Sequence, residues 1–166
     1  FSANENQTAI DTVTATDAEG DDITFTISGD ELAITSAGVL TFASAPDYET
    51  KSSYTATVTA SDGVNTATQN ITVNVINVND VAPEFTSEAT FSANENQTAI
   101  DTVTATDAEG DEVTFTISGD ELAITSAGVL TFVSAPDYET KTSYTATVTA
   151  SDGTNASTQD LSLIHI

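Results

Sequence analysis

The chain has 166 residues, with two Lys against 26 Asp and Glu, which gives a formal net charge of −24. An acidic field of this size excludes nucleic acid and anionic membrane surfaces as partners, and no apolar run is long enough for direct insertion into a membrane. Because the chain has no Cys, a disulfide framework and a zinc–thiolate site are excluded as well.

Short strands are predicted along the chain, because apolar and polar side chains alternate with a period of two. The alternation is clearest in "ITVNV" at 71–75, "VTFTI" at 113–117 and "YTATVTA" at 144–150. Polar residues, mostly Thr, alternate there with Val, Ile, Phe or Ala, which is typical of strands with one buried face. Gly residues and a Pro-bearing "SAPDYE" turn separate such stretches. No segment has a helical stripe of useful length.

The chain consists of two copies of one module. Residues 1–69 match residues 91–159 at 62 of 69 positions. Six or seven short strands in each copy predict an antiparallel β-sandwich of immunoglobulin-like size. The expected fold is therefore all-β, with two tandem Greek-key sandwiches joined by a short linker. We place the first repeat at residues 1–80, with a truncated N-terminal strand, and the second at 81–166.

The second copy departs from the first after residue 159. "NITVNV" at 70–75 shares no residue with "DLSLIH" at 160–165. The final stretch, "LSLIHI" at Leu161–Ile166, resembles the translation of a transposon end that is used to prepare DNA-sequencing libraries. We therefore expect an artefact that replaces the true last strand, and leave His165, the only His, out of the functional assignment.

The acidic residues gather at strand ends and turns. In chain order they lie in "ANEN" (Glu5), "TDAEGD" (Asp17, Glu19, Asp21), "PDYE" (Asp47, Glu49), "SDG" (Asp62) and the linker "NVND" (Asp80, beside Asn79). Clustered carboxylates disfavour one another's ionisation, and a hard cation removes that cost. Ca²⁺ takes about six to eight oxygens from carboxylates, amides and backbone carbonyls. Each motif alone also fits a plain turn, since Asp and Gly favour turns.

Taken in order, these motifs resemble the calcium motifs of cadherin repeats. "ANEN", "PDYE", "TASDG" and "NVNDVAP" match the Glu near the first strand, the Asp-x-Glu, the Ala-x-Asp and the junction motif of that family. The resemblance covers both copies, and their near identity resembles the arrays of bacterial surface adhesins. It implies that two to three Ca²⁺ ions bind at the junction between the repeats.

The resemblance also implies the ligands. They are Glu5, Asp47 and Glu49 of the first repeat, the side chains of Asn79 and Asp80 with the backbone carbonyls of Val78 and Val81, and Asp107, Glu109 and Asp152 of the second repeat. Half-sites that lack a neighbouring repeat are Asp17, Glu19 and Asp62, and Glu95, Asp137 and Glu139. Two positions depart from the family pattern. Asn77 stands where the family usually has Asp, and Glu109 stands where a second Asp is usual, so that its longer side chain must fold back.

The expected function is a calcium-rigidified adhesion or spacer module of a large, repetitive, extracellular surface protein, in which adhesion is homophilic or directed at another cell surface. Neighbouring repeats of the same chain are the expected partners, together with other cell-surface proteins or glycans. Two alternatives stay open: a calcium-independent immunoglobulin-like spacer, and a β-sandwich that binds a glycan or a protein partner.

An enzyme is not expected from this sequence. The chain has no Cys, no Gly-rich phosphate loop and no His outside its last six residues. The acidic residues lie at the ends of the modules and not in an evident cleft, so that the usual parts of a catalytic site are missing.

Overall fold

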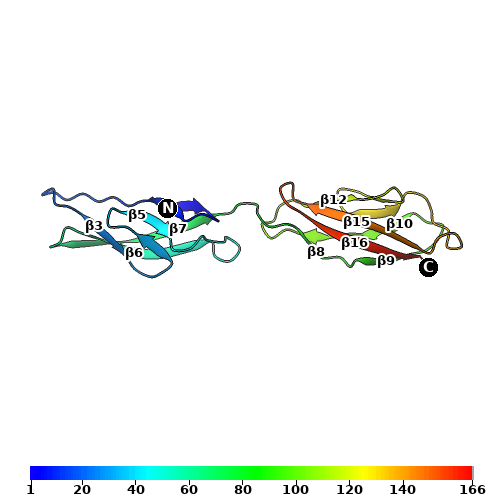
Figure 1. Ribbon diagram of the computed structural model, residues 1–166, viewed down its shortest axis with the longest axis horizontal. Coiled ribbons are helices and arrows are strands. Elements are labelled where there is room, and N and C mark those ends of the chain that lie inside the picture. The colour runs from blue at the N-terminus through cyan, green and yellow to red at the C-terminus, as the bar shows by residue number, and fades with distance from the viewer. Residues whose placement is uncertain (166) are drawn as a thin grey trace. The chain divides into compact units, whose positions relative to one another are not determined.

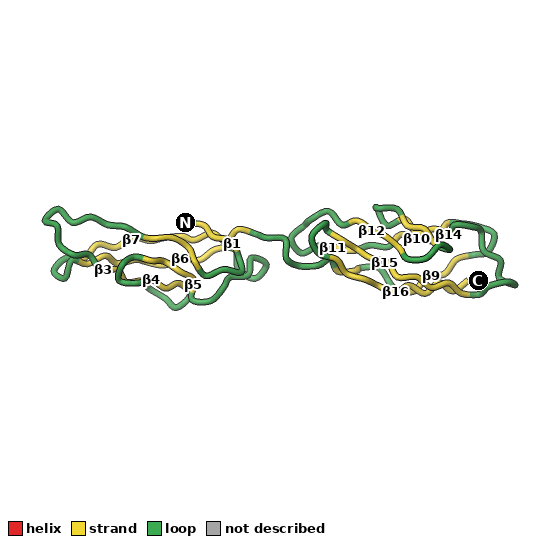
Figure 2. The backbone as a smooth tube through the Cα atoms, turned by 45° about the horizontal axis from the view of Figure 1, so that its top comes forward, coloured by secondary structure: helices red, strands yellow, loops and turns green. Residues whose placement is uncertain are grey.

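The computed structural model describes residues 1–165. The chain divides into two compact units, Phe1–Val78 and Asn79–Ile166, near the predicted end of the first repeat at residue 80. Both units are built from strands and loops (Figure 2). Within residues 1–165, no helix has the length and apolar character that crossing a membrane requires.

The first unit is a sandwich of two sheets (Figure 1). The larger sheet has the strand order β1–β7–β6–β3 and the smaller one β2–β5–β4. The bounds are β1 Ser2–Asn4, β2 Ala9–Thr12, β3 Thr24–Ile27, β4 Leu32–Ile34, β5 Val39–Phe42, β6 Ser53–Ser61 and β7 Thr66–Ile76. The sandwich predicted from the alternation is confirmed.

The second unit repeats this arrangement, with the orders β9–β16–β15–β12 and β10–β14–β13, and adds a short β8–β11 pair. The bounds are β8 Glu84–Phe85, β9 Thr90–Ala93, β10 Ala99–Thr102, β11 Ala105–Thr106, β12 Thr114–Ile117, β13 Leu122–Ile124, β14 Val129–Phe132, β15 Ser143–Ser151 and β16 Ala156–His165. β8 lies before residue 91, where the segment that matches residues 1–69 begins.

One strand pair in each unit is parallel, which the prediction of antiparallel sheets did not anticipate. β1 runs parallel to β7, and β9 runs parallel to β16. The other pairs are antiparallel, including the long pairs β6–β7 and β15–β16. A period of two is the same in both kinds of sheet, so alternation alone does not distinguish them.

The core of each unit lies between its two sheets, and the alternation places it there. In β7, Ile71, Val73 and Val75 are buried, while the residues between them are exposed. Leu40 of β5 is fully buried on the other side of the same core. Burial of the apolar surface of each such side chain stabilises the folded state by about 1.5–3 kcal/mol.

The last strand of the second unit has the pattern that this position needs. Leu161 and Leu163 are buried and pair with Ala146 and Tyr144, as Ile71 and Val73 pair with Ala56 and Tyr54 in the first unit. The origin of Leu161–Ile166 as an artefact stays a prediction, because any alternating apolar stretch would fill this place. Ile166 lies outside the described residues.

Backbone hydrogen bonds bring the acidic loops together at the ends of each sandwich. The "ANEN" segment follows β1, and the Glu5 N–H donates to the Ile76 carbonyl at the end of β7 (3.1 Å). The Asn6 N–H donates to the Pro46 carbonyl (3.0 Å) in the loop between β5 and β6. One end of the first sandwich therefore carries the "ANEN" and "PDYE" motifs and the chain that leads into the linker.

Candidate metal centre

Glu5 is a buried carboxylate that ties three segments of the first unit together. Glu5 is 4% exposed, and among residues 1–165 it is the one charged residue that is buried. One carboxylate oxygen accepts a hydrogen bond from the Tyr48 N–H (2.8 Å), and the other from the Val78 N–H (2.7 Å). A buried carboxylate needs such donors, since burial of an unpaired charge is costly.

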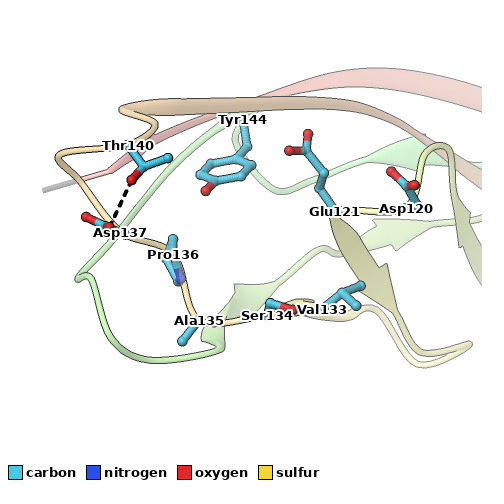
Figure 3. A pocket seen from close by; sticks show the side chains of 9 residues that line it. All are labelled: Asp120, Glu121, Val133, Ser134, Ala135, Pro136, Asp137, Thr140 and Tyr144. Atoms are coloured by element: carbon cyan, nitrogen blue, oxygen red, sulfur yellow. Dashed lines mark hydrogen bonds between the residues drawn. The ribbon is translucent and has the colours of Figure 1, made fainter.

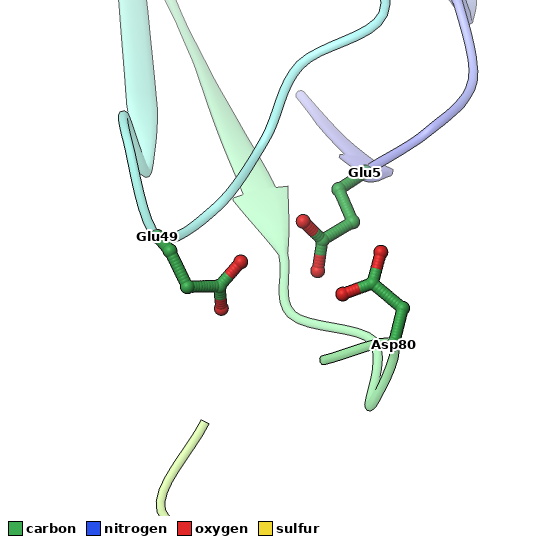
Figure 4. A group of neighbouring side chains, drawn as sticks. All are labelled: Glu5, Glu49 and Asp80. Atoms are coloured by element: carbon green, nitrogen blue, oxygen red, sulfur yellow. The ribbon is translucent and has the colours of Figure 1, made fainter. Parts of the chain in front are cut away.

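Glu49 brings a second negative charge to the same place. Figure 4 shows the carboxylate of Glu49 turned toward that of Glu5, and an oxygen of one lies within 4.8 Å of an oxygen of the other. Lys51, the only cation of this unit, binds Glu31 instead. Two carboxylates held this close repel each other, and a cation between them would remove the repulsion.

Asp47 belongs to the same loop, but its carboxylate bonds to the loop itself. The Thr50 hydroxyl donates to Asp47 Oδ2 (2.9 Å), and the Thr50 N–H donates to Oδ1 (3.1 Å). These donors, the hydroxyl first, hold the pKa of Asp47 below its ordinary value. Asp47 therefore stays ionised at neutral pH, as a calcium ligand must.

The "TDAEGD" turn of the second unit gathers three carboxylates. Oxygens of Asp107, Glu109 and Asp111 lie within 4.8 Å of one another. Asp107 Oδ1 accepts hydrogen bonds from the backbone N–H groups of Glu109 (3.0 Å) and Asp111 (3.1 Å), which fixes the turn. The motif is thus a turn and a carboxylate cluster at once, because the Asp side chain that closes the turn also brings its neighbours together.

Two oxygens of this cluster are buried without a hydrogen-bond partner: Asp107 Oδ2 and Glu109 Oε2. Leaving a buried polar atom unsatisfied costs about 1–3 kcal/mol, and more for a charged group. A hard cation that takes oxygen ligands would satisfy both atoms. The donor set of this turn therefore fits Ca²⁺.

The linker is held against this turn. Glu109 Oε1 accepts hydrogen bonds from the backbone N–H groups of Asp80 (3.1 Å) and Val81 (2.9 Å). The Asn79 amide donates to Asp111 Oδ2 (2.8 Å). The long side chain of Glu109 therefore reaches the linker with one oxygen, and its other oxygen is the unpartnered one.

Asp152 lies in the "SDG" turn beside the linker. Its Oδ1 accepts the N–H groups of Thr154 and Asn155 (both 2.6 Å), and the Asn155 amide donates to Asn79 Oδ1 (2.6 Å). Burial raises the pKa of Asp152, but the Asn155 and Thr154 N–H groups outweigh it and leave that pKa below its ordinary value. Asp152 is therefore ionised, and Asn155 connects it to Asn79.

The predicted half-sites form similar groups. Asp17, Glu19 and Asp21 of the first unit lie together, as do Glu95, Asp137 and Glu139 of the second. Asp62 lies with Asp17 along the wall of one pocket. The Asn65 and Val64 N–H groups hold the pKa of Asp62 low, and the Thr140 hydroxyl does the same for the pKa of Asp137.

The structure places most of the predicted carboxylates in separate small groups, and three further residues lie in or beside these groups. Asp47, Asp62 and Asp152 stand outside the carboxylate groups, and Val78 and Val81 contribute N–H donors in the contacts described. The additional residues are Asp21, Asp111 and Asn155. Asp21 and Asp111 end the "TDAEGD" motif, and this position was the signal that could have indicated them. Asn155 had no signal in the motif, because its role depends on the fold of the turn.

No protein-family model matches the chain, but several curated proteins do. Protocadherin Fat 4 of Mus musculus is 36% identical over 142 residues, which is 75% of this chain and 3% of that protein. The protocadherin-like wing polarity protein stan of Drosophila melanogaster is 31% identical over an alignment of 186 positions, which covers 96% of this chain and 5% of that protein. Chitinase A of Pseudoalteromonas piscicida is 33% identical over 146 residues, 86% of this chain and 18% of that protein. The chain thus spans a small part of each relative.

Solved structures with the same fold cover nearly the whole chain. The human protocadherin-24 EC1-2 structure has a TM-score of 0.79 and 22% identity, and covers 99% of this chain and 89% of that one. The Drosophila N-cadherin EC1-4 structure has a TM-score of 0.76 and 21% identity, and covers 99% of this chain and 46% of that one. At 22% and 21% identity, these matches show a shared fold.

Proposed function

Because the chain consists of cadherin-like repeats, we propose that it is a calcium-binding, calcium-rigidified segment of a larger extracellular adhesion or spacer protein. The near identity of the two copies over residues 1–69 and 91–159 supports a long, repetitive parent, of the kind found in bacterial surface adhesins. The proposed role is not catalytic. The match to chitinase A covers 18% of that protein, and its activity is not carried over.

The observation that carries the proposal is the pair of buried, unpartnered oxygens in the second unit. Asp107 Oδ2 and Glu109 Oε2 have no hydrogen-bond donor and lie beside a third carboxylate, Asp111. Burial of these oxygens without a hydrogen-bond donor costs free energy, and a bound cation would offset that cost. Extracellular calcium modules have dissociation constants of about 10⁻⁴–10⁻³ M. A calcium ion bound with such an affinity would satisfy both oxygens.

We assign the ions to the linker and to the acidic residues of both units. The proposed ligands are Glu5, Asp47 and Glu49, the linker side chains Asn79 and Asp80 with the carbonyls of Val78 and Val81, and Asp107, Glu109 and Asp152, with Asp111 added from the structure. Two to three Ca²⁺ ions would neutralise half to three quarters of the charge of these eight carboxylates. When bound, Ca²⁺ would supply positive charge, and the residues of this chain would supply the oxygen ligands.

The proposed consequence is stiffness between neighbouring repeats. Without Ca²⁺, carboxylates such as Glu5 and Glu49 repel each other. With Ca²⁺, ligands from the linker and both units close around the ions, so that the free energy of binding becomes stability of the ordered linker. Since extracellular calcium is far more abundant than cytosolic calcium, such a module would stiffen after export.

The experiment is a calcium titration of thermal unfolding. At roughly 5 mM Ca²⁺ and a dissociation constant of about 10⁻⁴ M, each ion stabilises the folded state by about 2 kcal/mol. We therefore expect Tm to rise by roughly 10 °C, with a much smaller effect of the same concentration of Mg²⁺. A Tm that does not respond to millimolar calcium would favour a calcium-independent spacer and reject the proposal.

A further inference from the structure

The two lysines of the chain make the same pair of contacts in the two units. Lys51 Nζ lies 2.5 Å from Glu31 Oε1 and 4.5 Å from the centroid of the Tyr54 ring. Lys141 Nζ lies 2.5 Å from Glu121 Oε1 and 4.4 Å from the centroid of the Tyr144 ring. In a chain with a charge of −24, both lysine ammonium groups thus bind a glutamate and lie over a tyrosine ring.

Each lysine is connected to the core through its tyrosine. Tyr54 of β6 packs edge-on against Phe42 of β5, with 5.1 Å between the ring centroids, and Phe42 is buried. Tyr144 packs in the same way against Phe132, at 5.0 Å. The aromatic ring is therefore a fixed surface, and a cation over its face is attracted by about 0.5–1 kcal/mol at an exposed site.

Glu31 connects the lysine to the other end of the same loop. We call residues 43–52, between β5 and β6, the ligand loop, because it carries Asp47 and Glu49. The Ala43 N–H, at the start of the loop, donates to the Glu31 carbonyl (2.9 Å), and Lys51, near its end, binds the Glu31 carboxylate. Glu31 thus holds both ends of the ligand loop.

Lys51 also closes the turn inside the ligand loop. The Lys51 N–H donates to the Asp47 carbonyl (2.9 Å), so the position of Lys51 sets the position of the turn that carries Asp47 and Glu49. A shift of the Lys51 backbone would move both carboxylates relative to Glu5, whose own carboxylate is fixed by two N–H donors.

The equivalent loop of the second unit shows why such a tie is needed. A pocket of about 370 Å³ lies beside this loop. Figure 3 shows Tyr144 and Glu121 on one side of it and Ala135, Pro136 and Asp137 on the other. The loop is therefore not packed tightly onto the sandwich along this stretch, and tight packing is what normally fixes a position in a protein. Lys141, which follows this loop, contacts Glu121 and Tyr144, two of the residues that line the pocket.

We propose that Lys51, held between Glu31 and Tyr54, is a positioning residue that fixes the ligand loop and so preorganises Asp47 and Glu49 for calcium. This inference rests on the proposed function. Electrostatics alone predicts the opposite effect of substituting Lys51, because removal of a positive charge near a cation site should by itself strengthen calcium binding. Positioning and electrostatics therefore predict opposite effects of one substitution.

The test is calcium calorimetry of Lys51→Met, which keeps the aliphatic chain and removes the ammonium group. We expect the half-saturating calcium concentration of the junction to rise about twofold to fivefold, the range that corresponds to a surface ion pair. Glu31→Gln, with the opposite change in charge, should weaken binding as well. The matched control is Lys141→Met, which removes the same contacts beside the half-site acids Asp137 and Glu139 and should leave the junction unchanged.

Unchanged or tighter binding by Lys51→Met would overturn the inference, as would an equal effect of Lys141→Met. If the wild-type chain itself binds no calcium, the proposed function fails. Amide hydrogen exchange of Thr50 and Lys51 in the calcium-free chain then decides the role of the lysine alone. Exchange that is about twofold to fivefold faster in Lys51→Met supports the tie, and unchanged exchange refutes it.

Discussion

The proposed ligands of the "TDAEGD" turn divide the work between their two oxygens. Asp107 uses Oδ1 to close the turn through two N–H donors, and Glu109 uses Oε1 to hold the linker. The second oxygen of each is buried and unpartnered. A carboxylate can thus build the site and still offer an oxygen to a metal, which an amide or a hydroxyl would do less well because neither carries a negative charge.

Asp107→Asn separates these two roles. The Asn oxygen can still accept the turn hydrogen bonds, while its NH₂ group can donate to Glu109 Oε2 in place of a repelling charge. We expect calcium affinity to fall by about tenfold or more, with Tm in the absence of calcium unchanged or higher. Calcium calorimetry and calcium-free melting check this, with Asp17→Asn as the matched control in the other copy. A variant with wild-type affinity would remove Asp107 from the ligand set.

Asp80→Ala tests the linker assignment. Because Asp80 is proposed to supply a ligand directly from the linker, its loss should remove most of the calcium-induced rise in Tm. Asp30→Ala, which removes an exposed acid from a turn of the first unit, makes the same change in net charge and should keep the full response. Equal responses of the two variants would show that the linker carboxylate is not a ligand.

How far the site could be predicted depends on the distance in sequence over which its residues interact. Acids within one turn, such as Asp17 and Glu19, were found from the motif. Asp111 ends the same turn motif and was missed, although the motif contains it. The contacts of Asn155 with Asn79 and of Lys51 with Glu31 join segments that lie far apart in the sequence, and no local pattern indicates them.

At the level of the strands, alternation was sufficient to predict the sandwich but not its edges. The buried positions of β7 follow from "ITVNV" alone, because one face of the strand must cover the core. The parallel pairing of β1 with β7 could not be predicted in this way, since the pattern is the same in both directions. The short β8–β11 pair depends on contacts between distant segments and has no period of its own.

Gly38, in the turn between β4 and β5, is a position at which the backbone requires glycine. It adopts a φ of +87°, and a Cβ there would overlap the Val13 carbonyl oxygen and contact the Phe25 ring. Gly29 has a similar φ of +81° but no atom within 4 Å of such a Cβ. Both substitutions to Ala therefore share the conformational cost, about 1–2 kcal/mol, and differ in the overlap.

We expect Gly38→Ala to lower the free energy of unfolding by about 1–3 kcal/mol more than Gly29→Ala, the usual cost of overpacking. Urea denaturation of the calcium-free chain measures the difference. Equal losses in the two variants would mean that the Val13 segment moves away without cost, and that the close approach of these two segments does not stabilise the unit.

The negative charge of the whole chain is concentrated at particular places. The net charge of −24 comes largely from residues at turns and strand ends, and four groups of acids lie close enough to share a cation. The only two cations are both engaged with Glu31 and Glu121. External cations would offset the repulsion among these carboxylates, as the proposed function requires.

Small-angle scattering of the two-repeat chain tests the central claim most directly. In a chelator, the linker should allow many arrangements of the two repeats. On addition of millimolar calcium, we expect the mean particle length to increase and the range of lengths to narrow, while the same concentration of magnesium has much less effect. Scattering curves that are identical with and without calcium would contradict the account.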